Sequence, residues 1–253
     1  MGEVAYDRMG VGYRKVRRAD PRIAARVEAA LGNAHTVLNV GAGAGSYEPR
    51  EREVTAVEPS RVMIAQRPEG AAAVVQANAE ALPFEDGSFD AAMAIITLHH
   101  WTDPAAGLAE MARVARERVI VLTFDPAPLA DLWLVQDYFP RTLEIHGDSM
   151  PPIAELAATM GPSTAIEPVP IPSRCEDGFF CALWDRPEWH LDPEVRRASS
   201  VWHLMDAEET ERGLAALRAD LESGAWDERH GHLREAAELD VGLRLLVASA
   251  EAA

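Results

Sequence analysis

A short apolar strand that runs directly into a run of glycines constrains this chain most. Residues 36–40 (TVLNV) form a predicted buried strand, and residues 41–45 (GAGAG) follow it without a break. Glycine lets the backbone turn tightly and approach a ligand closely. Open α/β sheets bind ligands outside the carboxyl ends of their strands, where these glycines fall. The sequence therefore predicts a small-molecule site above residues 41–45.

The first half of the chain alternates predicted strands with predicted helices. Ile23, Val27 and Leu31 recur every four positions and predict a helix over residues 20–31, which Asp20 is suited to cap. A second helix is predicted from Ser60 to residue 67, and a third starts after residue 103. Further strands are predicted at residues 54–57, 73–76, 89–96 and 118–124. This alternation requires right-handed crossovers and predicts a doubly wound, Rossmann-like, mostly parallel α/β sheet.

The second half of the chain changes to a mainly helical pattern. Residues 164–169 are predicted as a sixth strand, and residues 241–247 as a last, antiparallel strand that completes a seven-stranded sheet. No stretch has the composition of a linker, so we expect a single domain over residues 1–253 with its cofactor half at residues 35–125. Residues 126–160 and 175–238 are expected to form a helical cap over the carboxyl edge of the sheet.

The charge balance limits the partners of the chain. It carries 41 acidic and 24 basic side chains, a net charge of −17. Nucleic acids and anionic membranes bind basic surfaces, so neither is expected as a partner. Two cysteines are too few for a disulfide framework, and no cluster of side chains has the spacing of metal ligands. No basic-then-apolar signal opens the chain, and we expect a cytoplasmic monomer or homodimer that acts on a small molecule.

An acidic residue at the end of the second strand favours a nucleoside ligand. Glu58 follows Gly41 by 17 positions, which suits hydrogen bonds to ribose hydroxyls. The dinucleotide fingerprint needs a third small residue, where this chain has Ser46, and a helix that holds the pyrophosphate. Pro49 leaves only about one turn for that helix. A nicotinamide-dependent dehydrogenase is therefore disfavoured.

Five segments between residues 36 and 124 occur together in a characteristic order. They are VLNVGAGAGS, VTAVEPS, NAEALPFEDGSFD, LHHW and RVA. In these segments the chain resembles the class I S-adenosylmethionine-dependent methyltransferases, in particular the type 11 branch related to the ubiquinone and menaquinone biosynthesis enzymes. The resemblance implies S-adenosylmethionine as the cofactor and S-adenosylhomocysteine as the product.

The resemblance also implies where the cofactor would lie. Its methionine end would face the glycines, the N-terminal segment and a backbone carbonyl at Ile96 or Thr97. Its ribose hydroxyls would bind Glu58, and its adenine would contact the loop that starts at Asn78. The cofactor-binding residues implied in this way are Tyr13, Arg17, Gly41, Ala42, Gly43, Glu58, Pro59, Met63, Asn78, Ala79, Glu80 and Thr97.

Two positions depart from the pattern of the family. The family usually has an acidic residue where this chain has Asn39, and often an aspartate where it has Asn78. Asn39 removes a negative charge near the ammonium and sulfonium groups of the cofactor. The amide oxygen of Asn78 is still able to accept from the adenine amino group. These departures keep a second interpretation open, a protein that binds S-adenosylmethionine or its product, or an enzyme of this fold that does not methylate.

Candidate catalytic residues follow strands four and five. His99 and His100 come directly after the fourth strand, where the methyl group would point, and a histidine suits a general base at neutral pH. The structural alternative is that one of them packs or caps the next helix. Asp125 follows the fifth strand and is the third candidate, with a turn residue before Pro126 as its alternative.

Aromatic residues of the expected cap suggest an acceptor pocket. Trp133, Tyr138 and Phe179 are candidate substrate-binding residues, and Trp101 is expected to cover the site. An aromatic lining would favour an apolar or aromatic methyl acceptor, with transfer to an O, N or C atom. The alternative is that these side chains form the core of the cap itself.

Overall fold

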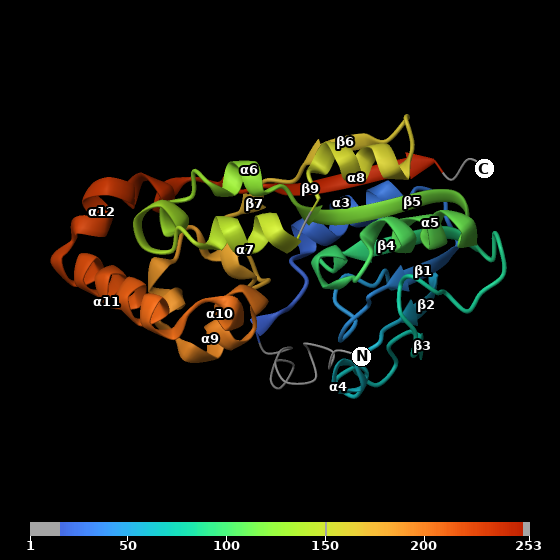
Figure 1. The fold of residues 1–253 in the computed structure, drawn as a ribbon, viewed down its shortest axis with the longest axis horizontal. Coiled ribbons are helices and arrows are strands. Elements are labelled where there is room, and N and C mark those ends of the chain that lie inside the picture. The colour runs from blue at the N-terminus through green and yellow to red at the C-terminus, as the bar shows by residue number, and fades with distance from the viewer. Residues whose placement is uncertain (1–15, 150, 250–253) are drawn as a thin grey trace.

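The computed structural model describes residues 16–149 and 151–249, which fold around a seven-stranded sheet (Figure 1). The strand order is β3 (Ala73–Val75), β2 (Glu53–Val57), β1 (Thr36–Val40), β4 (Phe89–Ile95), β5 (Ala115–Phe124), β9 (Leu243–Ser249) and β6 (Ala165–Pro168). Neighbouring strands from β3 to β5 pair in parallel, and β9 is antiparallel to both β5 and β6. The predicted doubly wound sheet with an antiparallel last strand is confirmed.

The strand order reverses between β1 and β4. The chain runs outward from β1 to β3 and then returns to place β4 on the other side of β1. The carboxyl ends of β1 and β4 therefore lie beside a crevice in which ligands of such sheets bind.

Helices cover both faces of the sheet. The helix α3 (Pro21–Leu31) packs against β5 on one face, whereas α5 (Pro104–Val114) and α8 (Ile153–Met160) pack on the other. Alternate residues of a strand point to opposite faces, and accordingly Val37 of β1 joins the first core and Leu38 joins the second. The segment 126–160 therefore does not belong entirely to a cap, because α8 packs against α5 and β9.

Aspartate side chains cap the N-termini of α3 and α5. The carboxylate of Asp20 accepts from the backbone N–H of Arg22, and Asp103 caps α5 through the N–H of Ala106. The helix α4 (Arg61–Ile64) is shorter than the sequence indicates, although Ser60 caps it. The strand β5 begins at Ala115, three residues earlier than predicted, because α5 passes into it without a loop.

The glycine-rich segment differs most from the prediction. Residues 41–52 form consecutive turns, and the short helix expected before Pro49 is absent from this described segment. Residues 41–52 therefore provide no helix N-terminus. A further difference is a second, two-stranded sheet of β7 (Ile171–Pro172) and β8 (Glu238–Leu239), which the sequence pattern does not indicate.

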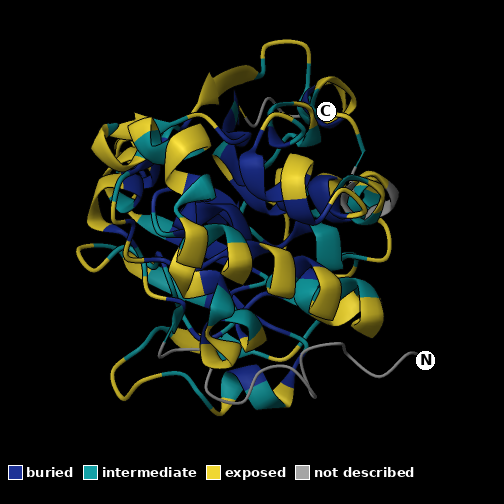
Figure 2. Ribbon diagram, turned by 90° about the vertical axis from the view of Figure 1, so that its left-hand side faces the viewer, coloured by how far each residue is buried: buried dark blue, intermediate teal, exposed yellow. Residues whose placement is uncertain are grey.

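The helices within residues 126–149 and 180–235 form a cap at one end of the molecule, the left-hand end in Figure 1. They are α6 (Pro126–Leu129), η2 (Leu134–Tyr138), α7 (Thr142–Ser149), η3 (Phe180–Leu183), η4 (Pro187–Leu191), α9 (Pro193–Arg197), α10 (Ser200–Leu204), α11 (Ala207–Ser223), α12 (Ala225–His230) and η5 (Gly231–Glu235). Figure 2 looks onto this end and shows helices with exposed outer faces around a buried interior. Within the described residues, no helix has the length and apolar character needed to span a membrane.

Candidate functional site

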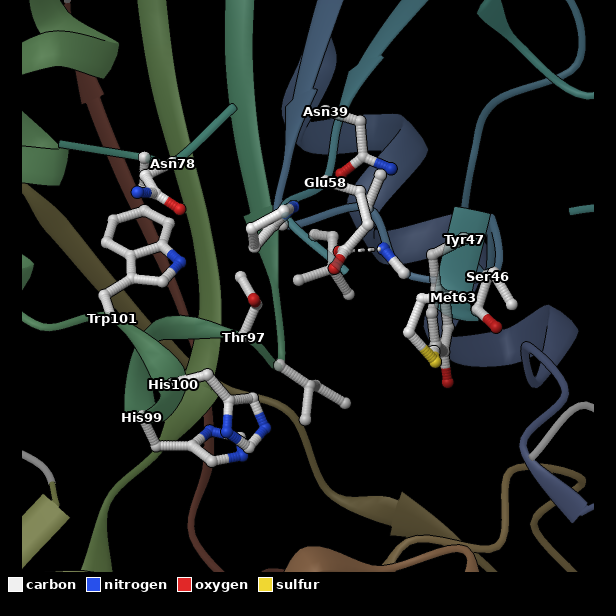
Figure 3. Close-up of a pocket in the computed structure, with 18 of the residues that line it drawn as sticks. Asn39, Ser46, Tyr47, Glu58, Met63, Asn78, Thr97, His99, His100 and Trp101 are labelled. Atoms are coloured by element: carbon white, nitrogen blue, oxygen red, sulfur yellow. Dashed lines mark hydrogen bonds between the residues drawn. The ribbon is translucent and has the colours of Figure 1, made fainter. Parts of the chain in front are cut away.

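A pocket of about 770 Å³ opens at the carboxyl ends of β1, β2 and β4 (Figure 3). Its volume lies in the range of small-molecule sites. One group of lining residues comes from the glycine-rich segment, the ends of β1 and β2 and the helix α4, namely Asn39, Gly41, Ala42, Gly43, Ala44, Ser46, Tyr47, Glu58, Pro59 and Met63. The other group consists of Arg17, Asn78, Ala79, Glu80, Ile95, Ile96, Thr97, His99, His100, Trp101, Thr102 and Leu204.

Gly41 brings the backbone of the first strand against the end of the fourth. Its φ angle is +69°, and a Cβ at this position would lie 2.2 Å from Oγ1 of Thr97. Only glycine meets both conditions, because a side chain is strained in this backbone region and here also collides with its neighbour. The glycine therefore allows the ends of β1 and β4 to line one continuous pocket.

Glu58 is a buried acceptor that two backbone N–H groups hold in place. It is 6% exposed and lies at the end of β2. Its Oε2 accepts from the N–H of Gly43 at 2.8 Å, and its Oε1 accepts from the N–H of Ser60 at 2.9 Å. These two hydrogen bonds fix the orientation of the carboxylate. This geometry suits the binding of neighbouring hydroxyl groups.

Asn78 and Trp101 lie together at one end of the pocket (Figure 3). The Trp101 ring packs on α5 at Gly107, where a Cβ would be 2.5 Å from the ring and 3.3 Å from Cβ of Ala79. Oε1 of Glu80 accepts from the N–H groups of Thr102 and Asp103, at 2.8 and 3.1 Å. Glu80 thus ties the Asn78 loop to the segment that carries Trp101. The indole gives this end a flat apolar wall beside an amide.

Two histidines lie at another side of the pocket, on the short 3-10 helix η1 (Leu98–His100). Their ring centroids are 3.8 Å apart, and both rings lie below Thr97 in Figure 3. Burial lowers the pKa of His100 to about 4, and the positive charge of Arg17 contributes to the shift. His100 is therefore uncharged at neutral pH. Ile96, directly before η1, has a φ angle of +52°, an unfavourable value for a β-branched residue.

Arg17 and Tyr47 both line the pocket, and both contact Asp177. Nε of Arg17 donates to Oδ1 of Asp177 at 2.5 Å, and the Tyr47 hydroxyl donates to Oδ2 at 3.0 Å. All three side chains are buried. The cationic guanidinium of Arg17 suits a carboxylate ligand, whereas the hydroxyl of Tyr47 is engaged and its ring faces the pocket.

A polar network lies behind the glycine-rich segment. Nδ2 of Asn39 donates to Oε1 of Glu48 at 3.2 Å, and the same oxygen accepts from Arg67 at 2.6 Å. Arg67 also donates to the carbonyl of Gly43 at 3.3 Å. These contacts stabilise residues 41–52 in the absence of a helix.

Four predicted site residues lie away from the pocket lining. Asp125 caps α6 through the N–H of Ala127 and lies 3.7 Å from Nε of Arg244. The other three, Trp133, Tyr138 and Phe179, are buried in the core that joins the cap to the sheet. Tyr13 lies outside the described residues. The other predicted residues, from Arg17 to Trp101, are brought together around the pocket.

The structure adds lining residues that the sequence did not assign to the site. Ser46 and Tyr47 directly follow the glycines of residues 41–45, so their position in the sequence could have indicated a role in the site. Leu204 comes from α10 of the cap and is 64% exposed although it is apolar. Because the return of α10 to the pocket depends on how the cap folds, no local pattern identified Leu204.

The residues present fit the S-adenosylmethionine that the resemblance implies. Glu58 offers a fixed carboxylate to ribose hydroxyls, and the amide of Asn78 and the ring of Trp101 suit the edge and the face of a purine. The close approach at Gly41 and the guanidinium of Arg17 suit an amino acid moiety. Among the described residues, no group of three His, Cys, Asp or Glu side chains is arranged to hold a metal ion.

Comparisons with known proteins agree with this fit. The sequence profile of the family described as "Methyltransferase domain" matches residues 38–123. The crystal structure of a candidate methyltransferase from an antibiotic biosynthesis pathway of Anabaena variabilis is similar, with 30% sequence identity and a TM-score of 0.86. That similarity covers 92% of this chain and 98% of the Anabaena chain.

Curated relatives match over shorter stretches. The uncharacterized methyltransferase YcgJ of Bacillus subtilis is 33% identical over 94 residues, which are 33% of this chain and 37% of its own length. The ubiquinone/menaquinone biosynthesis C-methyltransferase UbiE of Hahella chejuensis is 52% identical over 52 residues, 20% of this chain and 21% of its own. The chain thus matches well under half the length of these two relatives.

The Anabaena protein, by contrast, is similar along nearly its whole length, and the family profile matches the strands and loops that build the pocket. The chain belongs to the S-adenosylmethionine-dependent methyltransferase family.

Proposed function

We propose that this protein transfers the methyl group of S-adenosylmethionine to an O, N or C atom of a small-molecule acceptor. The observation that carries the proposal is one continuous pocket that joins Asn78, Glu58 and the pair His99–His100. When bound, the cofactor supplies a methyl group activated by its sulfonium. The chain itself needs to bind the two molecules, align them and exclude water.

The cofactor-binding side of the pocket is assigned to residues with fixed positions. Glu58 would bind the ribose hydroxyls, and Asn78 with the Ala79 backbone would bind the adenine edge. Arg17 would hold the carboxylate of the methionine moiety. The two backbone donors on Glu58 support its role, because they orient the carboxylate before the ligand arrives.

His99 and His100 are proposed to orient the acceptor and, for an acidic acceptor group, to take its proton. His100 is uncharged at neutral pH because burial and the charge of Arg17 lower its pKa to about 4. An imidazole with this pKa accepts a hydrogen bond readily but is a weak base toward an alcohol. The acceptor that suits His100 best therefore has an acidic O–H, N–H or C–H, or a nucleophile that needs no deprotonation.

The acceptor is proposed to be apolar or aromatic. The lining of the pocket includes the apolar side chains of Ile96 and Leu204 and the ring of Tyr47. Leu204 is a large exposed apolar side chain at a pocket, which is typical of a ligand contact. This support differs from the sequence argument, which relied on Trp133, Tyr138 and Phe179.

Two binding titrations and a labelling experiment test the function. Calorimetric titration is expected to show binding of S-adenosylhomocysteine and none of NAD. Incubation of metabolite extracts with an isotopically labelled methyl donor is expected to give a labelled small molecule that depends on the protein. Binding of NAD alone would exclude the proposal.

The two histidines are tested by substitution. His100→Ala and His99→Ala are expected to lower turnover with little change in the affinity for S-adenosylhomocysteine. Full turnover in both variants would mean that the pair has only a structural role.

A second candidate is a member of the same family that binds the cofactor without transferring methyl. The observation that favours it is the amide of Asn39, which places a neutral group at the end of β1. Tight binding of S-adenosylhomocysteine without any labelled product would support this candidate.

A further inference from the structure

A buried carboxylate of the cap lies between two side chains of the pocket wall. Asp177 is 0% exposed and lies in the loop between β7 and η3. It accepts hydrogen bonds from Arg17 and Tyr47, although it is not itself part of the pocket lining. We propose that Asp177 is a positioning residue that fixes the Arg17 and Tyr47 walls of the cofactor pocket.

Tyr47 depends on this contact because its backbone is strained. Its φ angle is +63°, and a non-glycine residue in this region persists only when its surroundings hold it. Its hydroxyl accepts from the N–H of Asp20 at 3.4 Å and donates to Asp177. Burial raises the pKa of Tyr47 well above its ordinary value, and the charge of Asp177 raises it further. The hydroxyl therefore keeps the proton that it donates.

Arg17 is held by the same loop on two sides. Its guanidinium pairs with Asp177 and lies 5.7 Å from the centroid of the Phe179 ring. The N–H of Gly178 donates to the carbonyl of Val16 at 3.0 Å, and a Cβ at Gly178 would be 2.4 Å from Cγ1 of Val16. The residues that flank the ion pair are thus in direct contact. These contacts therefore fix the position of the cap loop relative to the segment that carries Arg17.

One carboxylate consequently links the cap loop, the glycine-rich segment and the N-terminal segment. A buried charge is stable only while its partners are in place, and removal of one partner leaves the others uncompensated. Loss of the Asp177 charge is therefore expected to loosen both pocket walls. The expected effect on ligand affinity rests on the proposed function, whereas the effect on the mobility of residues 41–47 does not.

Asp177→Asn is the first test. Asparagine presents one oxygen and one NH2 group, so either Arg17 or Tyr47 would face a donor instead of an acceptor. The dissociation constant for S-adenosylhomocysteine, measured by calorimetry, is expected to rise about ten-fold, which corresponds to about 1.4 kcal/mol. In the ligand-free protein, amide hydrogen exchange of residues 41–47 is expected to become faster.

Asp185→Asn is the matched control. Asp185 is also a buried cap carboxylate, and it accepts from the N–H of Arg174 at 2.8 Å and from Nε of Arg186 at 3.3 Å. Neither partner lines the pocket. This variant is expected to lose stability while the affinity for S-adenosylhomocysteine and the exchange of residues 41–47 stay as in the wild type.

Tyr47→Phe removes the hydrogen bond from Tyr47 to Asp177, together with the acceptor for the N–H of Asp20, and leaves the ion pair between Asp177 and Arg17. It is expected to weaken binding of S-adenosylhomocysteine and to speed amide exchange of residues 41–47. The double variant Asp177→Asn/Tyr47→Phe is expected to lose less binding free energy than the two single variants lose in sum. Unchanged exchange in folded Asp177→Asn, or in Tyr47→Phe if Asp177→Asn does not fold, overturns the proposal. If the wild type does not bind S-adenosylhomocysteine but the Asp177 and Tyr47 variants still show faster exchange, the proposed function is refuted and the positioning role is supported.

Discussion

Asn39 is 2% exposed and lies at the pocket end of β1. A charge introduced at this buried position would interact strongly with its neighbours. Its amide donates to Glu48, whose carboxylate also pairs with Arg67. An aspartate at position 39 would face Glu48 as a second carboxylate. The neutral Asn39 at the end of β1 is therefore matched to the acidic Glu48, to which it donates a hydrogen bond.

Asn39→Asp is expected to reduce the free energy of unfolding by about 1–3 kcal/mol, because a buried donor is replaced by a like charge. Urea denaturation at neutral pH measures the change. The double variant Asn39→Asp/Glu48→Gln exchanges donor and acceptor and is expected to recover part of the loss. Unaltered stability of the single variant would contradict this account.

A buried histidine of the cap predicts how stability depends on pH. Burial lowers the pKa of His190 to about 3, and Arg196 and Arg186 contribute, whereas the ordinary value is 6.5. Between pH 6.5 and about 3 the unfolded chain binds a proton that the folded chain does not, so stability falls as the pH falls through this window. His100 adds to the loss down to a pH of about 4.

His190→Phe is expected to reduce the slope of unfolding free energy against pH by up to about 1.4 kcal/mol per unit between pH 4 and 6. Urea denaturation at several pH values in this range measures the slope. Asp20, whose pKa is lowered to about 2, loses its stabilising contribution only as the pH falls below 3.8, outside this range. An equal slope in the variant and the wild type would refute the assignment.

At the scale of elements, the pocket depends on how the ends of β1, β2 and β4 meet. The turns of residues 41–52 replace the expected helix, and contacts from Glu58, Glu48 and Arg67 hold them. Gly41 is the point of closest approach, since its missing side chain leaves room for Thr97.

Gly41→Ala is expected to cost more stability than Gly70→Ala and, unlike it, to weaken S-adenosylhomocysteine binding. Both glycines have positive φ angles, of +69° and +81°, but a Cβ at Gly70 would meet nothing within 4 Å. Gly70→Ala therefore isolates the backbone strain, about 1–2 kcal/mol, from the collision with Thr97. Thermal denaturation and calorimetry separate the two effects. Wild-type affinity in Gly41→Ala would show that the approach of β1 to β4 is not needed.

At the scale of the whole molecule, the cap and one face of the sheet share a core. Trp133 is 2% exposed, and its Nε1 donates to the carbonyl of Trp184 at 2.9 Å. Its ring also packs edge-on against Tyr138 and Trp226. The same core includes Ile120 and Leu122 of β5. The aromatic side chains of the cap therefore stabilise its attachment to the sheet.

Trp133→Phe is expected to lower the free energy of unfolding by about 1–3 kcal/mol, because the Trp184 carbonyl loses its buried donor. The KM for the acceptor is expected to stay unchanged, because Trp133 does not line the pocket. Leu204→Ser is expected to have the opposite effects: it raises the KM for the acceptor and changes the free energy of unfolding little. A raised KM in Trp133→Phe with normal stability would restore Trp133 as a substrate contact.

The seven-stranded sheet and most of the pocket were accessible from the sequence because they rest on local patterns. Apolar runs, the capping residues Asp20 and Asp103, and the glycines at residues 41–45 each act within a few positions. Parallel strands align their carboxyl ends at one edge, so side chains after β1, β2 and β4 meet there whatever the details of packing.

The sequence by itself determined the α/β sheet, the position of its binding edge and the residues that follow each strand. Only the tertiary structure decided that Trp133, Tyr138 and Phe179 are buried in the core, that Leu204 reaches the pocket and that Asp177 joins Arg17 to Tyr47. The physical reason is distance along the chain. Arg17 and Asp177 are 160 positions apart, and local patterns such as periodicity and capping do not indicate which distant side chains will form a buried ion pair.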